Sequence, residues 1–183
     1  MLGWSLQQPF ASLIAWGAKK WETRGYQRAY RGPVVICSTV RKNNGMGRTL
    51  ASVDACLMLP AFQEAMAPHI DRPAGQNVVY ASDLPYGKAL AMVDIIGCMP
   101  THKAVEMGLT PKEEAFGDYS IGRYFFLTDN LRRFPEPVPI RGYLGIFEIK
   151  DPDVEAAITV QLEKLNRLNS GLDILPHQTL GMV

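Results

Sequence analysis

Two apolar runs constrain the fold of this chain more than any other feature. Val34–Cys37 and Ala89–Ile96 are almost continuously apolar. Such runs are typical of strands that are buried on both faces of a sheet. We therefore expect a sheet that is covered on both sides. Four further segments are rich in strand-forming residues and add shorter strands at 4–6, 20–24, 123–127 and 143–149.

Helical patterns lie between and after these strands. Phe10, Leu13, Ile14 and Gly17 fall on one helical face after Pro9, and Gly17 is suited to end that helix. Further helices are expected at 49–59, at 101–108 with Thr101 as its cap, and from Asp153, which caps the last helix. The remaining segments are predicted to be an exposed loop at 40–48, a weakly patterned insertion at 60–85, an extended proline-rich stretch at 134–139 and a C-terminal tail.

The order of these elements favours one fold class. The connections are mostly local, and strands and helices do not alternate as they do in a Rossmann-type sheet. We therefore predict an α+β fold in which five or six short strands form a small curved or closed sheet with peripheral helices.

Composition indicates which class of protein and which cellular location to expect. Its 47% hydrophobic and 20% charged residues are ordinary for a soluble globular protein, no stretch is apolar enough to span a bilayer, and the N-terminus lacks a secretory signal pattern. We expect a cytoplasmic protein without membrane association. Its three cysteines and three histidines are scattered, which predicts reduced thiols, no metal and no cofactor.

Charge is distributed unevenly. The chain has a net charge of +1, but residues 19–48 hold eight basic residues and one acid, so this segment carries +7 and the remainder −6. A positive region on a mildly acidic body suits an anionic ligand. A solvated face of salt bridges is the alternative.

The segment from Gly17 to Arg24 is the strongest candidate site. A helix ends at Gly17 and a strand begins, so Lys19 is expected at a corner from which it projects into a cleft. In the strand, Lys20, Glu22 and Arg24 share one face by the period of two, while Trp21 and Thr23 take the other. The carboxylate would accept hydrogen bonds from a base or sugar, and the cations would hold phosphate. A surface ladder that only solvates the strand remains the alternative.

A second candidate lies just before a later strand. In Gly117-Asp118-Tyr119-Ser120-Ile121-Gly122-Arg123, the glycines allow close approach of the backbone to a ligand, Tyr119 offers a stacking face, Ser120 a hydroxyl and Arg123 a phosphate contact. A tight turn with Tyr119 covering the core is the alternative. Glycines in Arg141–Gly145 indicate a bend.

These blocks together resemble a known family. Ser5–Ala11, Gly17-x-Lys19-x-x-Glu22-x-Arg24 and Tyr30–Pro33 resemble the start of an ASCH domain, and the blocks at 117–123 and 141–145 resemble the second half of its longer bacterial and phage members. The resemblance covers roughly residues 3–149. It implies a PUA-like β-barrel over residues 1–150, with the poorly patterned insertion near 40–85, followed by a C-terminal helix and tail at 151–183.

The resemblance also implies a function. ASCH domains have been proposed to bind RNA, and related domains bind RNA or modified bases. By this analogy the ligand is RNA, a nucleoside or a nucleotide, with DNA possible, bound in a basic cleft. The residues implied or indicated as ligand contacts are Gln8, Pro9, Lys19, Lys20, Glu22, Arg24, Arg31, Tyr119, Ser120 and Arg123.

Two other functions stay open. Some small ASCH proteins deacetylate N4-acetylcytidine with a threonine three residues after the signature lysine, and a longer relative is described as a ribonuclease. Here Glu22 occupies the nucleophile position, so a hydrolase would instead use Lys19, or a desolvated Lys20, with a lowered pKa and Glu22 as general base. A protein-interaction module, using the segments 60–85 or 134–139, would present a large exposed apolar patch. The sequence does not indicate the oligomeric state.

Overall fold

The protein is described by a computed structural model that places residues 1–40, 49–71 and 78–170. The predicted loop at 40–48 and most of the tail therefore lie outside the described residues. The strands and helices, in chain order, are β1 (Leu2–Leu6), α1 (Phe10–Ala15), β2 (Trp21–Arg24), β3 (Gly32–Ser38), α2 (Leu50–Leu57), α3 (Pro60–Met66), β4 (Lys88–Pro100), α4 (Pro111–Ala115), β5 (Tyr124–Pro139), β6 (Ile146–Glu148) and α5 (Pro152–Asn169). Three short 3₁₀ turns lie at Ala67–His69, Ala81–Asp83 and Thr101–Lys103.

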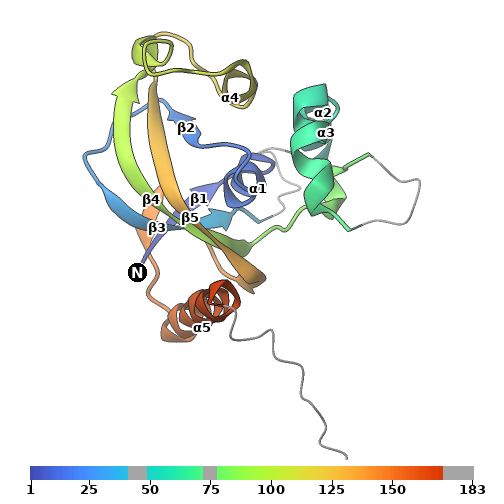
Figure 1. Ribbon diagram of the computed structural model, residues 1–183, viewed down its shortest axis with the longest axis vertical. Helices are drawn as coiled ribbons and strands as arrows, with labels where there is room; N and C mark the ends of the chain where they lie inside the picture. The colour runs from blue at the N-terminus through green and yellow to red at the C-terminus, as the bar shows by residue number, and fades with distance from the viewer. Residues whose placement is uncertain (41–48, 72–77, 171–183) are drawn as a thin grey trace, which may run out of the picture.

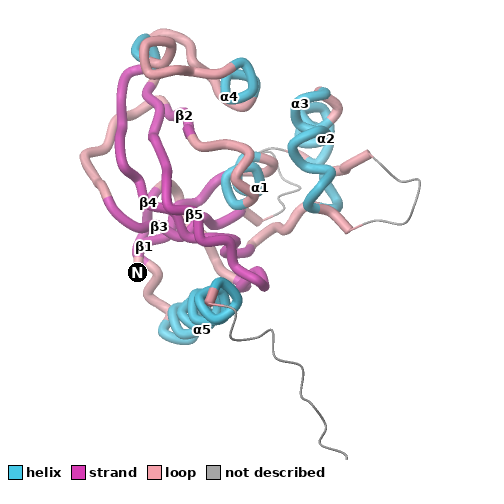
Figure 2. Tube along the Cα trace, viewed as in Figure 1, coloured by secondary structure: helices cyan, strands magenta, loops and turns pink. Residues whose placement is uncertain are grey.

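Six strands form one curled, half-barrel sheet in the order β2-β5-β4-β3-β1-β6 (Figures 1 and 2). The pairs are antiparallel except for β1 with β3. This architecture confirms the predicted α+β fold, in which five or six strands form a small curved sheet with peripheral helices.

The two longest strands bend the sheet. The ladder between β4 and β5 shifts register three times, between Ala89 and Ala91, between Met92 and Asp94, and between Ile95 and Gly97. Each irregularity bends the strands and increases the local twist. The first part of β5 pairs with both β2 and the end of β4, and its last part pairs with the start of β4.

The sheet is buried on both faces, as the apolar runs predicted. Val34 and Ile36 face the inside of the curl, whereas Val35 and Cys37 face the side covered by α5, and all four are fully buried. Helix α5 packs on that side through Ile158, and Figure 1 shows it lying across the sheet away from α1, α2 and α3. A third apolar cluster joins α1 to α2 and α3.

Several boundaries differ from those expected. Asp151, rather than Asp153, caps α5, because its carboxylate accepts hydrogen bonds from the backbone amides of Asp153 and Val154. Thr101 lies within a 3₁₀ turn instead of capping a helix that runs to Gly108. Its hydroxyl donates instead to the carbonyl of Ser120 at 2.7 Å, and the carbonyl of Arg123 lies 3.2 Å away.

The proline-rich stretch is extended, as predicted, but it is the end of β5 and not a linker between two strands. Pro139 pairs with Lys88 of β4. The side chain of Gln161 on α5 accepts a hydrogen bond from the backbone amide of Glu136 at 3.0 Å. A partner on a distant helix therefore supports a segment whose prolines cannot donate to a sheet.

Candidate functional site

The signature segment begins at the corner between α1 and β2. Gly17 adopts a positive φ of 77°, a conformation that glycine accepts without strain, and the amides of Ala18 and Lys19 both donate to the carbonyl of Leu13. This corner turns Lys19 inward. Its side chain is fully buried, so it does not project into an open cleft as the sequence led us to expect.

The buried ammonium of Lys19 is enclosed by oxygen atoms. It donates to the carbonyls of Trp21 and Phe116 and lies 3.7 Å from a carboxylate oxygen of Glu113 and 4.0 Å from one of Glu22. Burial lowers the pKa of Lys19, while both carboxylates act in the opposite direction. The ammonium thus joins β2 to the segment that follows α4.

Glu113 is a residue that the sequence analysis missed. Besides facing Lys19, its carboxylate accepts hydrogen bonds from the backbone amides of Lys20 at 3.0 Å and Trp21 at 2.9 Å. The hydroxyl of Thr110 accepts from the amide of Glu113. The pattern Thr110-x-x-Glu113 therefore signalled the start of a helix. It gave no sign that the carboxylate faces a lysine ninety residues earlier in the chain.

Glu22 and Arg24 lie side by side on the inner face of β2. The Nη2 atom of Arg24 is 3.2 Å from Glu22 Oε1 and donates to the carbonyl of Ser5 at 3.3 Å. The guanidinium also lies 5.9 Å from the centre of the Trp4 ring. Glu22 is only 7% exposed. The shared face of Glu22 and Arg24 is as the period of two predicted.

Three polar groups near this pair have no hydrogen-bond partner among the described residues. They are Arg24 Nε, Trp4 Nε1 and Ser5 Oγ, all buried. Unpaired buried donors are uncommon because each loses its hydrogen bonds to water. Of the three residues, only Arg24 lines the cleft described next, whereas Ser5 Oγ lies against Gly142.

A cleft of about 410 Å³ opens over Glu22 and Arg24. Aromatic side chains of α1, α3 and the segment after α4 form part of its walls, and Arg123, which precedes the partner of Arg24 in the sheet, also lines it. The lining residues are Gln7, Phe10, Glu22, Thr23, Arg24, Cys56, Leu59, Phe62, Ala115, Phe116, Gly117, Asp118 and Arg123. The volume lies within the range of small-molecule sites.

The charges of the cleft are balanced. Arg24 pairs with Glu22, and the Nε atom of Arg123 lies 3.2 Å from a carboxylate oxygen of Asp118. Hydrogen bonds from Ser120, supported by Arg123, hold the pKa of Asp118 below its ordinary value. Of the basic residues at 19–31, which the structure describes, only Arg24 lines the cleft, and this lining is better matched to a polar base edge than to several phosphates.

Four predicted contacts on the N-terminal side lie away from the cleft lining. Gln8 is buried and donates to the carbonyl of Pro85 at 2.7 Å, while Gln7 takes the lining position. Pro9 follows a cis peptide bond at the start of α1. Arg31 is exposed and donates to backbone carbonyls of its own loop. Lys20 is exposed and precedes β2.

Tyr119 and Ser120 are placed differently from Arg123. The ring of Tyr119 lies over Gly117 and against Phe125, with 6.4 Å between ring centres, which is the outer side of β2. Burial, with nearby carboxylates, raises the pKa of Tyr119 well above its ordinary value. Ser120 is exposed, and its amide donates to Asp118 Oδ1. Both residues thus shape the wall that carries Arg123.

Two other kinds of feature are absent from the described residues. No group of three or more histidine, cysteine or acidic residues there is arranged to hold a metal ion. No helix in the placed parts of the chain has the length and hydrophobicity needed to cross a membrane.

Comparison with known proteins identifies the family. The ASCH domain model matches residues 5–168, and the chain therefore belongs to the ASCH family, which is associated with RNA binding. The match extends through most of α5. The predicted family resemblance is thereby confirmed.

Two individual proteins are similar to the chain. Human activating signal cointegrator 1 is 25% identical over 167 residues, an alignment that covers 90% of this chain but only 25% of that protein. The chain thus spans about a quarter of the relative's length. A crystal structure of a mutant ZmASCH protein from Zymomonas mobilis aligns with a TM-score of 0.46 and 10% identity, covering 87% of this chain and 94% of that one.

Proposed function

We propose that this protein binds RNA, or the base of a nucleotide, in the cleft over Glu22 and Arg24. The observation that carries the proposal is the pairing of a carboxylate acceptor with the unpaired Nε donor of Arg24 at the floor of an aromatic-walled cleft. Nucleobases present adjacent donors and acceptors on one edge and an apolar face above and below. The family association with RNA supports the same conclusion.

Each part of the cleft has a role in this proposal. Glu22 accepts a hydrogen bond from an amino or imino group of the base, and Arg24 donates to a neighbouring carbonyl or ring nitrogen. The buried Lys19 positions Glu22 without touching the ligand, since its side chain has no exposed surface. Arg123, 31% exposed in the lining of the cleft, faces the phosphate.

The test is binding of a short fluorescently labelled single-stranded RNA, its DNA counterpart and free nucleosides. Arg123→Gln should weaken RNA binding, whereas Arg167→Gln on α5, an exposed arginine far from the cleft in the fold, should not. Because the cleft charges are balanced, the slope of log K against log salt should correspond to only about one or two phosphates. Equal affinity of the two variants would remove the cleft as the RNA site.

Hydrolysis of RNA or of an acylated cytidine nucleoside is a second candidate. The observation that favours it is the buried Lys19, whose pKa is lowered by burial and which lies 4.0 Å from the carboxylate of Glu22 in the cleft lining, because buried lysines of this kind concentrate at catalytic sites. In such a reaction Glu22 would act as general base and Arg24 would stabilise the developing oxyanion. Mass spectrometry of the RNA and nucleoside samples tests it: products that form with wild type and not with Glu22→Gln support catalysis.

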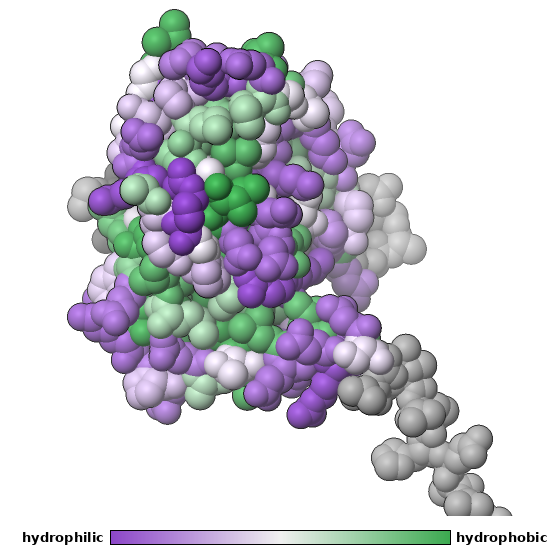
Figure 3. Space-filling model, turned by 60° about the vertical axis from the view of Figure 1, so that its left-hand side comes forward, coloured by the Kyte–Doolittle hydropathy of each residue, from purple (hydrophilic) through white to green (hydrophobic). Residues whose placement is uncertain are grey.

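The interaction-module alternative has less support. On the face seen in Figure 3, hydrophobic side chains are divided by hydrophilic ones and do not form one continuous apolar area. The most exposed large apolar side chains, Val105, Ile121 and Leu144, belong to separate loops.

A further inference from the structure

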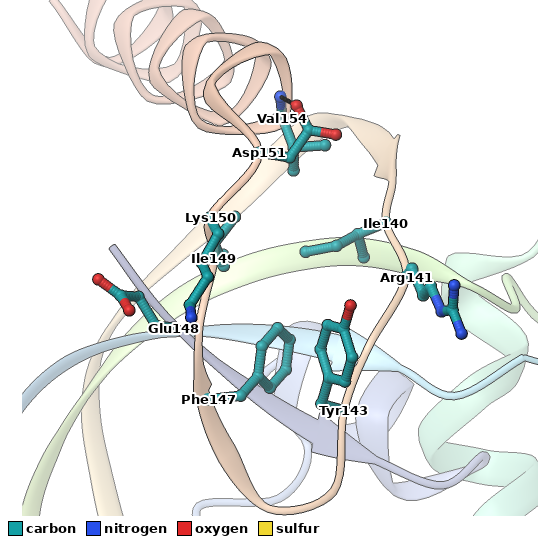
Figure 4. Close-up of a pocket in the computed structure, with 9 residues that line it drawn as sticks. All are labelled: Ile140, Arg141, Tyr143, Phe147, Glu148, Ile149, Lys150, Asp151 and Val154. Atoms are coloured by element: carbon teal, nitrogen blue, oxygen red, sulfur yellow. Dashed lines mark hydrogen bonds between the residues drawn. The ribbon is translucent and has the colours of Figure 1, made fainter.

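A second hollow lies between β6 and the start of α5. Its volume is about 610 Å³, larger than the cleft. Figure 4 shows it between two arms of the chain, one leaving β5 at Ile140 and the other running from Phe147 to Asp151. None of the residues implied by the ASCH resemblance as ligand contacts lines it.

The base of this hollow is aromatic. The rings of Tyr143 and Phe147 meet at an angle of 63° with 5.5 Å between their centres (Figure 4). Phe147 packs directly on the backbone of Gly3, where an added Cβ atom would lie only 2.6 Å from the ring. Tyr143 is 58% exposed, so aromatic surface is available for stacking. An exposed ring fixed by a second ring is a suitable platform for a base.

Positive charge flanks the aromatic base. Arg141 and Lys150 come from the two arms, and neither has an ion-pair partner among the described residues; the Arg141 guanidinium lies 6.0 Å from the centre of the Tyr143 ring. The two acidic residues beside the hollow, Glu148 and Asp151, do not pair with these cations. Asp151 accepts hydrogen bonds as the cap of α5, and Glu148 points away from the hollow in Figure 4.

Backbone hydrogen bonds hold both arms. The amide of Ser5 donates to the carbonyl of Gly145 at 3.0 Å, the amide of Ile149 to Met1 at 2.9 Å, and the amide of Ile140 to Gly87 at 3.0 Å. The hollow is therefore formed before any ligand arrives. Pre-formed sites lose less free energy to ordering when they bind.

The hollow is connected to the cleft through β1. The carbonyl of Ser5 accepts the hydrogen bond from Arg24 in the cleft. The same residue lies against the loop that carries Tyr143, since a Cβ atom on Gly142 would be 2.5 Å from Ser5 Oγ. One residue of β1 thus separates the cation of the cleft from the loop of the second hollow.

We propose that this hollow binds a second nucleotide, with its base stacked on Tyr143 and its phosphate held by Arg141 and Lys150. A free nucleoside monophosphate and one nucleotide of a single-stranded RNA share this chemistry. The RNA form rests on the proposed function, because the same strand then continues into the cleft at Arg24. The mononucleotide form stands without it.

The experiment is isothermal titration calorimetry of the full chain with adenosine monophosphate and with a single-stranded RNA of about eight nucleotides. Tyr143→Ala removes the stacking ring, and Arg141→Gln with Lys150→Gln removes the charges. Each should weaken binding about tenfold or more. Lys164→Gln with Arg167→Gln makes the same charge change on α5, at a half-buried lysine paired with Glu136 and an exposed arginine, and should have no effect on binding.

The outcomes distinguish a free mononucleotide from RNA as the ligand, and the second hollow from the cleft as the binding site. Loss of mononucleotide binding in Tyr143→Ala but not in Arg123→Gln supports a mononucleotide site. Loss of RNA affinity in both supports one strand across both hollows. If Arg123→Gln weakens RNA binding while neither change in the second hollow affects either ligand, the second site is refuted and the proposed function stands. If neither ligand binds wild type, both are refuted. Should Tyr143→Ala fail to fold, the exposed charge pair carries the same test.

Discussion

Replacing Lys19 with methionine should destabilise the protein far more than replacing its neighbour Lys20. Methionine fills a similar volume but leaves the carboxylates of Glu22 and Glu113 without their buried cation and two carbonyls without a donor. Removing one partner of a buried charge pair typically costs about 3–5 kcal/mol. Lys20 is exposed, and substitutions at such positions usually change stability by about 0.5 kcal/mol or less.

Urea unfolding at neutral pH measures this difference directly. We expect Lys19→Met to lose about 3 kcal/mol, which for a chain of this length lowers the melting temperature by roughly 6–12 °C. Adding Glu113→Gln to Lys19→Met should restore part of the loss, because it removes the carboxylate that Lys19 leaves without a cation, while Glu22 still pairs with Arg24. If Lys19→Met and Lys20→Met unfold within about 0.5 kcal/mol of each other, the ion cluster does not support the corner between α1 and β2.

Three further outcomes follow from the same contacts. Burial lowers the pKa of Lys19, so the unfolded chain binds the proton of this lysine more tightly than the folded chain does. The free energy of unfolding of wild type should therefore rise relative to that of Lys19→Met as pH increases from the lowered pKa toward the ordinary 10.5. Urea unfolding in alkaline buffers measures this difference. Burial raises the pKa of Cys37 to about 12. A thiol reagent at about pH 8 should therefore modify the half-buried Cys56 in the native protein, and Cys37 only after unfolding. Equal modification rates of Cys37 and Cys56 in the native protein would contradict this. In thermal unfolding, Asp151→Ala should lower the free energy of unfolding by about 1 kcal/mol through loss of the α5 cap, and Asp153→Ala should lower it clearly less. The reverse order would show that Asp153 is the cap, as the sequence predicted.

The sequence predicted the fold well where burial alone decides structure. The run Val34–Cys37 is apolar at every position, and the structure buries both of its faces, one inside the curl and one beneath α5. The extent of β5 was not predictable in this way. Its second half depends on shifted pairing with β4 and on the distant Gln161, and neither leaves a local pattern in the sequence.

In the candidate site as well, the sequence predicted the local relations between residues and not the contacts with distant residues. Alternation along a strand predicted that Glu22 and Arg24 share a face, because that relation is local. The burial of Lys19 depends on Glu113 and on the carbonyl of Phe116, which come from more than ninety residues away. A charged residue next to a strand is usually exposed, so the sequence favoured a projecting lysine. Only the folded chain shows what surrounds it.

The structure therefore separates two roles within one short signature. Lys19 is fully buried and connects the corner before β2 to α4, so its removal should act mainly on stability. Arg24 reaches the cleft with an unpaired Nε donor and also touches Ser5 on the strand leading to the second hollow. Its removal should act mainly on binding. Variants that lose RNA affinity without losing stability should consequently map to Arg24 and Arg123, whereas a variant of Lys19 that lost affinity at full stability would show that the lysine meets the ligand itself.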